Sequence, residues 1–200
     1  MQKLFISYLI SFVFIGSAVA QQYEEEIAHF QQELNEEFRN PEESPLPKKD
    51  LKKFKKHNFF PIDSTYKVLA KFVKTHNALP FKMQTTTDRL PTYEKYGEVI
   101  FEIEGQILTL SIYQSHQLRR TLKYKDHLFL PFTDLTNGKE TYGGGRYLDL
   151  TIPSGDTIVI DFNKAYNPYC AYNPSYSCPI PPEENDLNIR IEAGVKHSKL

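Results

Sequence analysis

The chain has 200 residues, and its 24 Lys and Arg nearly balance its 25 Asp and Glu, giving a formal net charge of −1. This balance provides no general attraction to nucleic acid or to an anionic membrane, so neither is expected as a partner. The length suits one compact domain with a sizeable buried core.

Residues 1–20 have the pattern of a secretory signal peptide. A lysine near the start precedes an apolar run from Leu4 to Val19, and small residues stand at Ala18 and Ala20. The run is slightly short for a spanning helix and lacks aromatic or basic anchors, so an uncleaved anchor is the weaker alternative. We therefore expect a periplasmic or secreted protein without a stable membrane anchor.

Residues 21–58 are predicted to form a helix followed by a charged linker. Apolar side chains recur at helical spacing of three and four, at Tyr23, Ile27, Phe30, Leu34 and Phe38. This stripe predicts an amphipathic helix that ends at Asn40-Pro41 and packs on the body. Docking of a partner on the same stripe is the alternative.

The linker is rich in lysine. Its six lysines are Lys48, Lys49, Lys52, Lys53, Lys55 and Lys56. Because acidic residues precede them, a solvated, self-compensating surface is the favoured interpretation, and contact with lipid headgroups or an acidic polymer is the alternative.

Residues 59–200 are predicted to form one β-rich domain. Segments rich in Val, Ile, Thr, Tyr and Phe alternate with turn signals at 65–73, 81–86, 96–105, 106–115, 127–132, 146–152, 156–162 and 187–193. Glu104-Gly105 and Pro153–Asp156 are typical of hairpin turns. The predicted fold is mainly β, an antiparallel barrel or sandwich with one N-terminal amphipathic helix.

A glycine run precedes one of these predicted strands. Gly143, Gly144 and Gly145 are followed by Arg146, whose planar guanidinium suits a carboxylate or phosphate. A phosphate loop normally leads into a helix, whereas this run leads into a strand. A tight turn with Arg146 paired to a nearby carboxylate is therefore favoured over an anion site.

Several carboxylates lie at strand ends or beside loops. Asp149 interrupts an apolar strand, Asp161 ends another, and Glu183 and Glu184 follow the prolines. A pair of carboxylates at suitable separation could hydrolyse a glycoside. Acceptance of hydrogen bonds from loop backbone is the favoured interpretation.

The stretch from 163 to 185, "NKAYNPYCAYNPSYSCPIPPEEN", holds both cysteines, Cys170 and Cys178. Its prolines prevent regular strand pairing, so we expect a rigid loop that covers an end of the sheet, with its tyrosines as packing or as a stacking surface for a ligand. The spacing of the cysteines permits a disulfide without requiring one.

The sequence carries no motif for a familiar catalytic or metal centre. It lacks a Gly-x-Ser-x-Gly elbow, a His-Glu-x-x-His pair and a Cys-x-x-Cys pair, and its six histidines are scattered. No metal and no cofactor are expected, and whether the protein is an enzyme stays open.

The segments "FFPID", "PFTDLTNGKETYGGGRYLDL" and "IDFNKAYNPYCAYNPSYSCPIPPEENDLNIRIEAGVK" together resemble a bacterial family known only as domain of unknown function sixteen eighty-four. The resemblance runs from Phe59 to Val195 and implies an exported protein with a mostly β body. It carries no activity over to this chain. The motif positions that it marks are Tyr142, Gly143, Gly145, Arg146, Asp161, Asn163, Ala165, Tyr166, Asn167, Pro168, Cys170, Cys178 and Pro179.

These observations predict a ligand site at one end of the sheet. A hairpin about Pro153–Asp156 would bring Arg146 against Asp161. The expected site residues are Tyr142, Gly143, Gly144, Gly145, Arg146, Asp161, Asn163, Tyr166 and Asn167. Binding of a small anionic or ring-containing molecule is the first hypothesis, and a structural or interaction module and a hydrolase are the alternatives.

Overall fold

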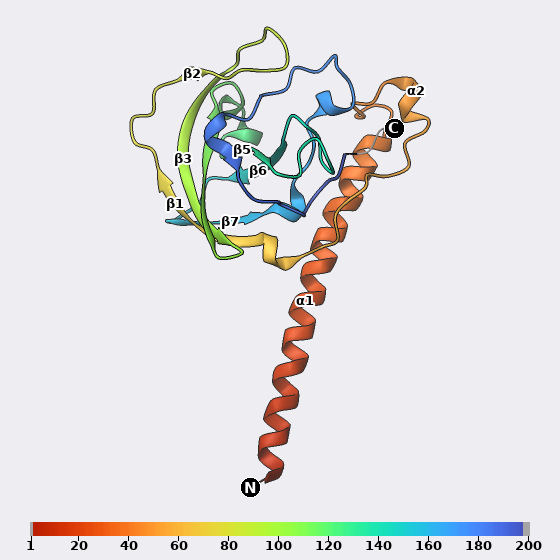
Figure 1. Ribbon diagram of the computed structural model, residues 1–200, viewed down its shortest axis with the longest axis vertical. Coiled ribbons are helices and arrows are strands. Elements are labelled where there is room, and N and C mark those ends of the chain that lie inside the picture. The colour runs from red at the N-terminus through yellow and green to blue at the C-terminus, as the bar shows by residue number, and fades with distance from the viewer. Residues whose placement is uncertain (1, 198–200) are drawn as a thin grey trace.

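The computed structural model describes residues 2–197, and the side chains of residues 20–197. A long helix, α1 (Gln2–Arg39), precedes a curled sheet, and the second half of this helix lies against the body (Figure 1). The side chains of residues 1–19, on which the signal-peptide prediction depends, lie outside the described part. Within that described part, no helix has the length and apolar character needed to cross a lipid bilayer.

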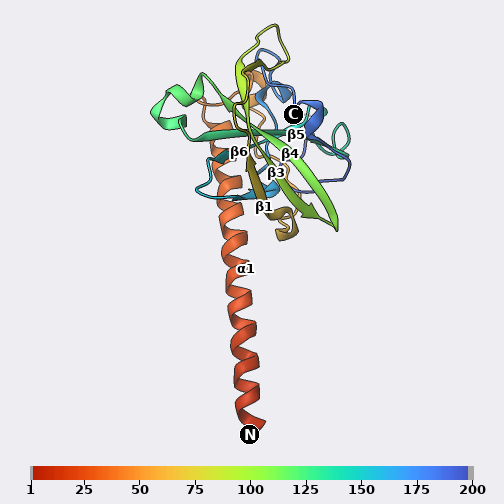
Figure 2. The same cartoon turned by 90° about the vertical axis from the view of Figure 1, so that its left-hand side faces the viewer.

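The sheet contains eight strands in the order β6-β5-β4-β3-β1-β7, with β2 paired to β3 and β8 paired to β5. Pairing is antiparallel except between β5 and β8. The strands are β1 (Lys67–Lys74), β2 (Phe81–Lys82), β3 (Thr92–Ile103), β4 (Gln106–Ser115), β5 (His127–Asp134), β6 (Arg146–Thr151), β7 (Thr157–Asp161) and β8 (Asp186–Leu187). The sheet curls into a half-barrel (Figures 1 and 2), which confirms the predicted mainly β, barrel-like fold with one N-terminal helix.

The turn predicted at Glu104-Gly105 joins β3 to β4. Both residues have positive φ, 52° at Glu104 and 76° at Gly105, as a two-residue type I′ hairpin turn requires. The flanking residues Ile103 and Gln106 pair directly. The glycine meets the backbone demand of this turn at no steric cost.

The hairpin predicted between β6 and β7 is wrong. β6 pairs with β5, and β7 pairs with β1 at the other end of the strand order. The connecting residues make their hydrogen bonds elsewhere, because Ile152 N donates to Asp126 O (2.9 Å) and Asp156 O accepts from Phe72 N (2.7 Å). The curl nevertheless brings the two ends of the sheet together, since Leu148 and Val159 line one cavity of about 360 Å³.

The inner face of the half-barrel holds the main core, and the C-terminal segment closes it. Residues 187–193 alternate between buried and exposed as predicted, yet only Asp186–Leu187 forms a strand. The buried members of the segment are Leu187, Ile189, Ile191 and Ala193, and they join core residues of β1, β3, β4, β5 and β7. The side chains of Arg146 and Asp134 supply hydrogen bonds to the backbone of this segment in place of a neighbouring strand.

Helix α1 packs on the body through the predicted stripe. Ile27 is fully buried and Phe38 is 1% exposed. Phe38 packs on Leu46 and Phe54 from the linker. The stripe therefore serves packing within this chain.

The linker places its lysines outward. It contains a short helix, α2 (Lys48–Leu51), and all six of its lysines are exposed, whereas Phe54 and His57 between them are buried. This alternation anchors the linker beneath α1 and leaves its charges in solvent.

His57 is the polar member of this anchor. Its ring lies 4.3 Å from Phe38 and 5.0 Å from Phe54 between centroids, and its backbone N–H donates to Asn35 Oδ1 on α1. Burial among these rings lowers the pKa of His57 to about 4, because the charged imidazolium is poorly solvated there.

This burial predicts a loss of stability in acid. The pKa of His57 is near 6.5 in the unfolded chain and about 4 in the fold, so the unfolded state binds the proton first. Stability is therefore intact above the unfolded pKa and falls as the pH drops towards the folded one. We expect His57 to account for a loss of about 2 kcal/mol between about pH 7 and pH 4.5 in urea unfolding. His57→Phe should remove this part of the pH dependence, and an unchanged slope in that variant would contradict the prediction.

Candidate functional site

One face of the β5–β6 pair carries aromatic and polar side chains together. Antiparallel register sets Phe129 opposite Asp149 and Pro131 opposite Tyr147. Because side chains alternate along a strand, Phe129 and Tyr147 lie on the face opposite the main core, which Leu128 and Leu148 enter. Their rings meet edge to face, with centroids 4.7 Å apart.

The loop after β7 forms a second wall facing these rings. Tyr166 and Tyr147 exchange two backbone hydrogen bonds, of 2.9 and 3.1 Å. Further along the loop, Thr86 N donates to Cys178 O and Ile180 N donates to Gln84 O, both at 2.9 Å. These bonds fix the loop to the β2–β3 side of the sheet, so its tyrosines are held in place.

Between the sheet face, the loop and α1 lies an open cavity of about 480 Å³, here called the tyrosine pocket. Its size is that of a small-molecule site. Its lining residues are Phe30, Leu34, Glu37, Tyr93, Leu118, Tyr124, His127, Phe129, Tyr147, Asp149, Tyr166, Pro168, Tyr169, Tyr176, Ser177, Cys178 and Pro179. Aromatic side chains form about half of this lining.

Hydrogen bonds hold the rings of the tyrosine pocket. Asp149 accepts from Tyr166 OH through Oδ2 and lies against His127 Nε2 through Oδ1, each at 2.8 Å. Tyr169 OH donates to Glu37 on α1, and Tyr147 OH donates to the Pro179 carbonyl. The phenol protons of Tyr147, Tyr166 and Tyr169 are thus already donated within the protein.

The ionisation of these phenols is suppressed. Burial is the largest cause that raises the pKa of Tyr147, Tyr166 and Tyr169 above its ordinary value, and nearby acidic groups add to the effect. The three side chains therefore stay neutral hydrogen-bond donors at physiological pH. The pocket can stack and orient a ligand, and its exposed acceptor is the Asp149 carboxylate, whose side chain is 53% exposed.

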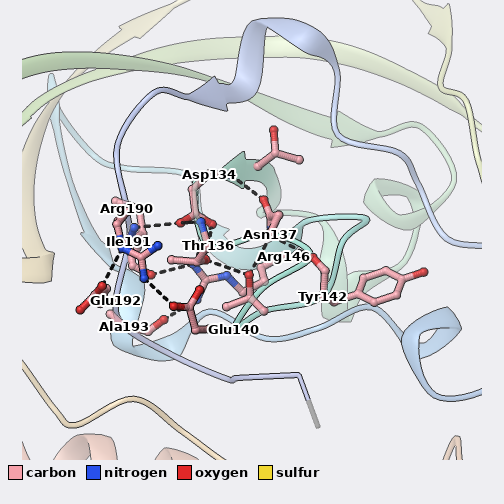
Figure 3. Close-up of polar contacts among 12 residues, drawn as sticks. Asp134, Thr136, Asn137, Glu140, Tyr142, Arg146, Arg190, Ile191, Glu192 and Ala193 are labelled. Carbon is pink, nitrogen blue, oxygen red and sulfur yellow. Dashed lines mark hydrogen bonds and ion pairs between the residues drawn. The ribbon is translucent and has the colours of Figure 1, made fainter. Parts of the chain in front are cut away.

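Arg146 does not line the tyrosine pocket and is fully buried. It lies beside Asp134 and the C-terminal segment (Figure 3). Its Nη2 donates to Asp134 Oδ1 (3.0 Å) and to Ile191 O (2.9 Å), and its Nη1 donates to Ala193 O. Asp134 also accepts from Ile191 N at 2.8 Å. The predicted contact between Arg146 and Asp161 is wrong, because β6 and β7 do not pair, whereas the favoured interpretation of Arg146 paired to a carboxylate is confirmed.

Asp161 and Asn163 tie α1 to the sheet. Tyr23 OH on α1 donates to both Asp161 oxygens, at 3.0 and 3.1 Å. Asn163 Nδ2 donates to Asp161 Oδ1 and to Asp63 O. These bonds connect α1, the segment at Asp63 and the end of β7, which gives the Asp-Phe-Asn motif a structural role.

The glycines form the predicted turn into β6. Gly143 and Gly144 are exposed, while Gly145 is buried at φ 87°, where a Cβ would come within 2.6 Å of Phe132 O. Tyr142 points away from Arg146 (Figure 3) and hydrogen-bonds Cys170. Of the nine predicted site residues, Tyr166 lines the tyrosine pocket, and its neighbour Asn167 is buried with Nδ2 on Tyr172 OH.

No disulfide joins Cys170 and Cys178 in the structure, and Cys178 lines the tyrosine pocket. Cys170 N donates to Cys178 Sγ at 3.1 Å. A hydrogen bond from Cys178 is the largest cause that lowers the pKa of Cys170 to about 7, and the same bond raises the pKa of Cys178. A disulfide between them stays a prediction.

Sequence reasoning named Asp149 as a candidate carboxylate but missed its neighbours on the sheet face of the pocket, His127, Phe129 and Tyr147. The pairs His127 and Phe129, and Tyr147 and Asp149, each have a spacing of two within a predicted strand, which places each pair on one face. That spacing indicates that the two members of each pair share a face. The sequence does not show that the two strands are partners or in what register they pair, so it could not place the two pairs side by side. Among the described side chains, no group of three or more His, Cys, Asp or Glu is arranged to hold a metal ion.

The fold and the pocket define a β-rich, half-barrel domain with an aromatic cavity on its outer face. The chain belongs to the family described as "Protein of unknown function (DUF1684)", whose model matches residues 52–196. This confirms the resemblance seen in the glycine and Asn-Pro motifs.

Comparison with solved structures gives a similar protein. The solution NMR structure of an uncharacterised protein from Haloarcula marismortui is 30% identical, with a TM-score of 0.68. The match covers 89% of this chain and 96% of that chain. A comparison with curated proteins found no match.

The burial of Arg146 predicts a large stability cost when its ion pair is broken. Arg146→Met or Asp134→Asn should each destabilise the fold by about 3–5 kcal/mol in urea unfolding, because each leaves a buried partner uncompensated. The double variant should cost less than the sum of the two. Arg190→Met is the matched control, since its ion pair with Glu140 is over a third exposed and its loss should cost far less than that of the buried pair. Equal costs for Arg146→Met and Arg190→Met would contradict the assignment.

The thiol pair predicts selective alkylation. Iodoacetamide should modify Cys170 before Cys178, with a rate that is half-maximal at the Cys170 pKa of about 7, because the thiolate is the reacting form. Cys178→Ala removes the stabilising hydrogen bond and should move this midpoint upward, as peptide mapping of the pH series would show. Preferential labelling of Cys178 would refute the prediction.

Proposed function

We propose that the protein binds a small molecule containing a ring in the tyrosine pocket. The observation that carries the proposal is the density of aromatic side chains around an open cavity of ligand size. Tyrosine faces stack on planar or sugar rings, and tyrosine loses little side-chain entropy when it is fixed.

The rings are prepared for binding before a ligand arrives. Tyr147 packs edge to face on Phe129 and Tyr166, and Tyr169 packs in the same way on Tyr176. The hydroxyl groups of Tyr147, Tyr166 and Tyr169 are also hydrogen-bonded. A fixed wall of this kind supports binding because the ligand does not have to order it.

The sequence of residues 1–20 supports a second part of the proposal, that binding takes place outside the cytoplasm. Its apolar run and small residues suit export. The thiol pair in the pocket wall would then meet oxidising conditions, in which a Cys170–Cys178 disulfide could form.

Removal of rim rings is the direct test. Saturation-transfer NMR with phenol, indole and methyl glucoside probes should give at least one binder. For that probe, Tyr124→Ala and Tyr169→Ala should each weaken binding by about 3- to 10-fold, since each removes one stacking face. Tyr124 is 36% exposed, so its variant should change the melting temperature little. Tyr169→Ala also removes contacts with Phe38, Tyr176 and Glu37 and should lower it.

Tyr96→Ala is the matched control, because Tyr96 is a half-buried ring that lies outside the tyrosine pocket. Its affinity for the same probe should equal that of the unmodified protein. Failure of all three probes to bind, or equal losses in the three variants, would overturn the proposed function.

A further inference from the structure

The lining of the tyrosine pocket holds two acids and one histidine, His127, which lies against Asp149. Among the described residues that line it, the acids are Glu37 and Asp149, and there is no lysine or arginine. Glu37 comes from α1 and Asp149 from β6, so the two carboxylates belong to different walls of the cavity. This electrostatic environment favours a cation and disfavours an anion.

The hydrogen-bond pattern has the same bias. Tyr166 and Tyr169 donate their hydroxyl protons to Asp149 and Glu37, and Tyr147 donates to a backbone carbonyl. These three phenols therefore have no proton left to donate to an anionic ligand. All three rings line the cavity, and the face of an aromatic ring attracts cations.

Nearby cations are paired with neighbouring groups, two of which, Ser177 and Tyr124, line the cavity. Arg89 donates to the Ser177 hydroxyl and carbonyl, and Arg119 pairs with Glu94 at 2.8 Å. The Lys123 ammonium lies 5.0 Å from the centre of the Tyr124 ring. One rim ring thus already holds a cation by its face.

We propose that the ligand of the tyrosine pocket is a small organic cation, a ring-bearing substituted ammonium or protonated amine. Its ring stacks on the tyrosine faces, and its positive charge is directed towards the carboxylates of Asp149 and Glu37. This inference rests on the proposed function and reverses the sign of ligand charge that Arg146 suggested in the sequence.

The test compares three probes that share one phenyl ring and differ in charge: benzyltrimethylammonium, benzyl alcohol and phenylacetate. Calorimetric titration of the purified protein at low salt should show the cation binding about 5- to 30-fold more tightly than the alcohol, with phenylacetate the weakest. Added salt should reduce the advantage of the cation.

Charge-removing variants assign the effect to the pocket. Asp149→Asn and Glu37→Gln should each reduce the affinity for benzyltrimethylammonium at least about 3-fold and leave that for benzyl alcohol unchanged, because neutral stacking does not need the carboxylate. Asp156→Asn is the control, since this acid lies beside a different cavity, and it should change neither affinity.

The outcomes separate the two proposals. Equal binding of the cation and the alcohol, both weakened by Tyr169→Ala, would overturn the preference for a cation and keep a ring-binding pocket. Tightest binding of phenylacetate would also overturn it. Absence of binding by all three probes would overturn both proposals.

Discussion

The half-barrel depends on a guanidinium with no access to water. Arg146 is the largest fully buried side chain among those described, and its donors reach two carbonyls of the C-terminal segment. Asp134 supplies the compensating charge and accepts a backbone N–H from the same segment. The ion pair thus replaces the hydrogen bonds that a neighbouring strand would make. It satisfies backbone groups of the C-terminal segment, which would otherwise be buried without partners.

This arrangement leaves the opposite face of the sheet available for a different use. The inner face is filled by aliphatic residues that the C-terminal segment closes. The outer face at β5 and β6 carries rings and a carboxylate, and a proline-rich loop and α1 cover it only partly. A rigid sheet face that the loop and α1 cover only partly is suited to a binding site.

The fold class followed from features that depend on local sequence. Alternation of apolar residues located the strands, and the Glu104-Gly105 pair located a turn whose backbone demands are met by those two residues. The stripe of α1 likewise specified a buried face. The strand partners could not be predicted in this way, because the pairing of β7 with β1 depends on contacts between residues about 90 positions apart in the chain.

The predicted site failed to form one unit for the same reason. Arg146 and Asp161 are close in sequence, yet one braces the C-terminal segment and the other clasps α1. The motif string that marks the family is therefore largely structural, and Tyr166 is the predicted site residue that also lines the cavity. His127 and Phe129 were invisible as site residues until the register with β6 was known.

Helix α1 has two roles that are thermodynamically linked. It supplies Phe30, Leu34 and Glu37 to the tyrosine pocket, and its Asn35 and Phe38 contact the buried His57. Under the proposed function, a bound molecule would stabilise the packing of α1, whereas a proton on His57 would weaken it. The two effects would then oppose each other equally: ligand binding would lower the proton affinity of His57, and acidification would promote release of the ligand.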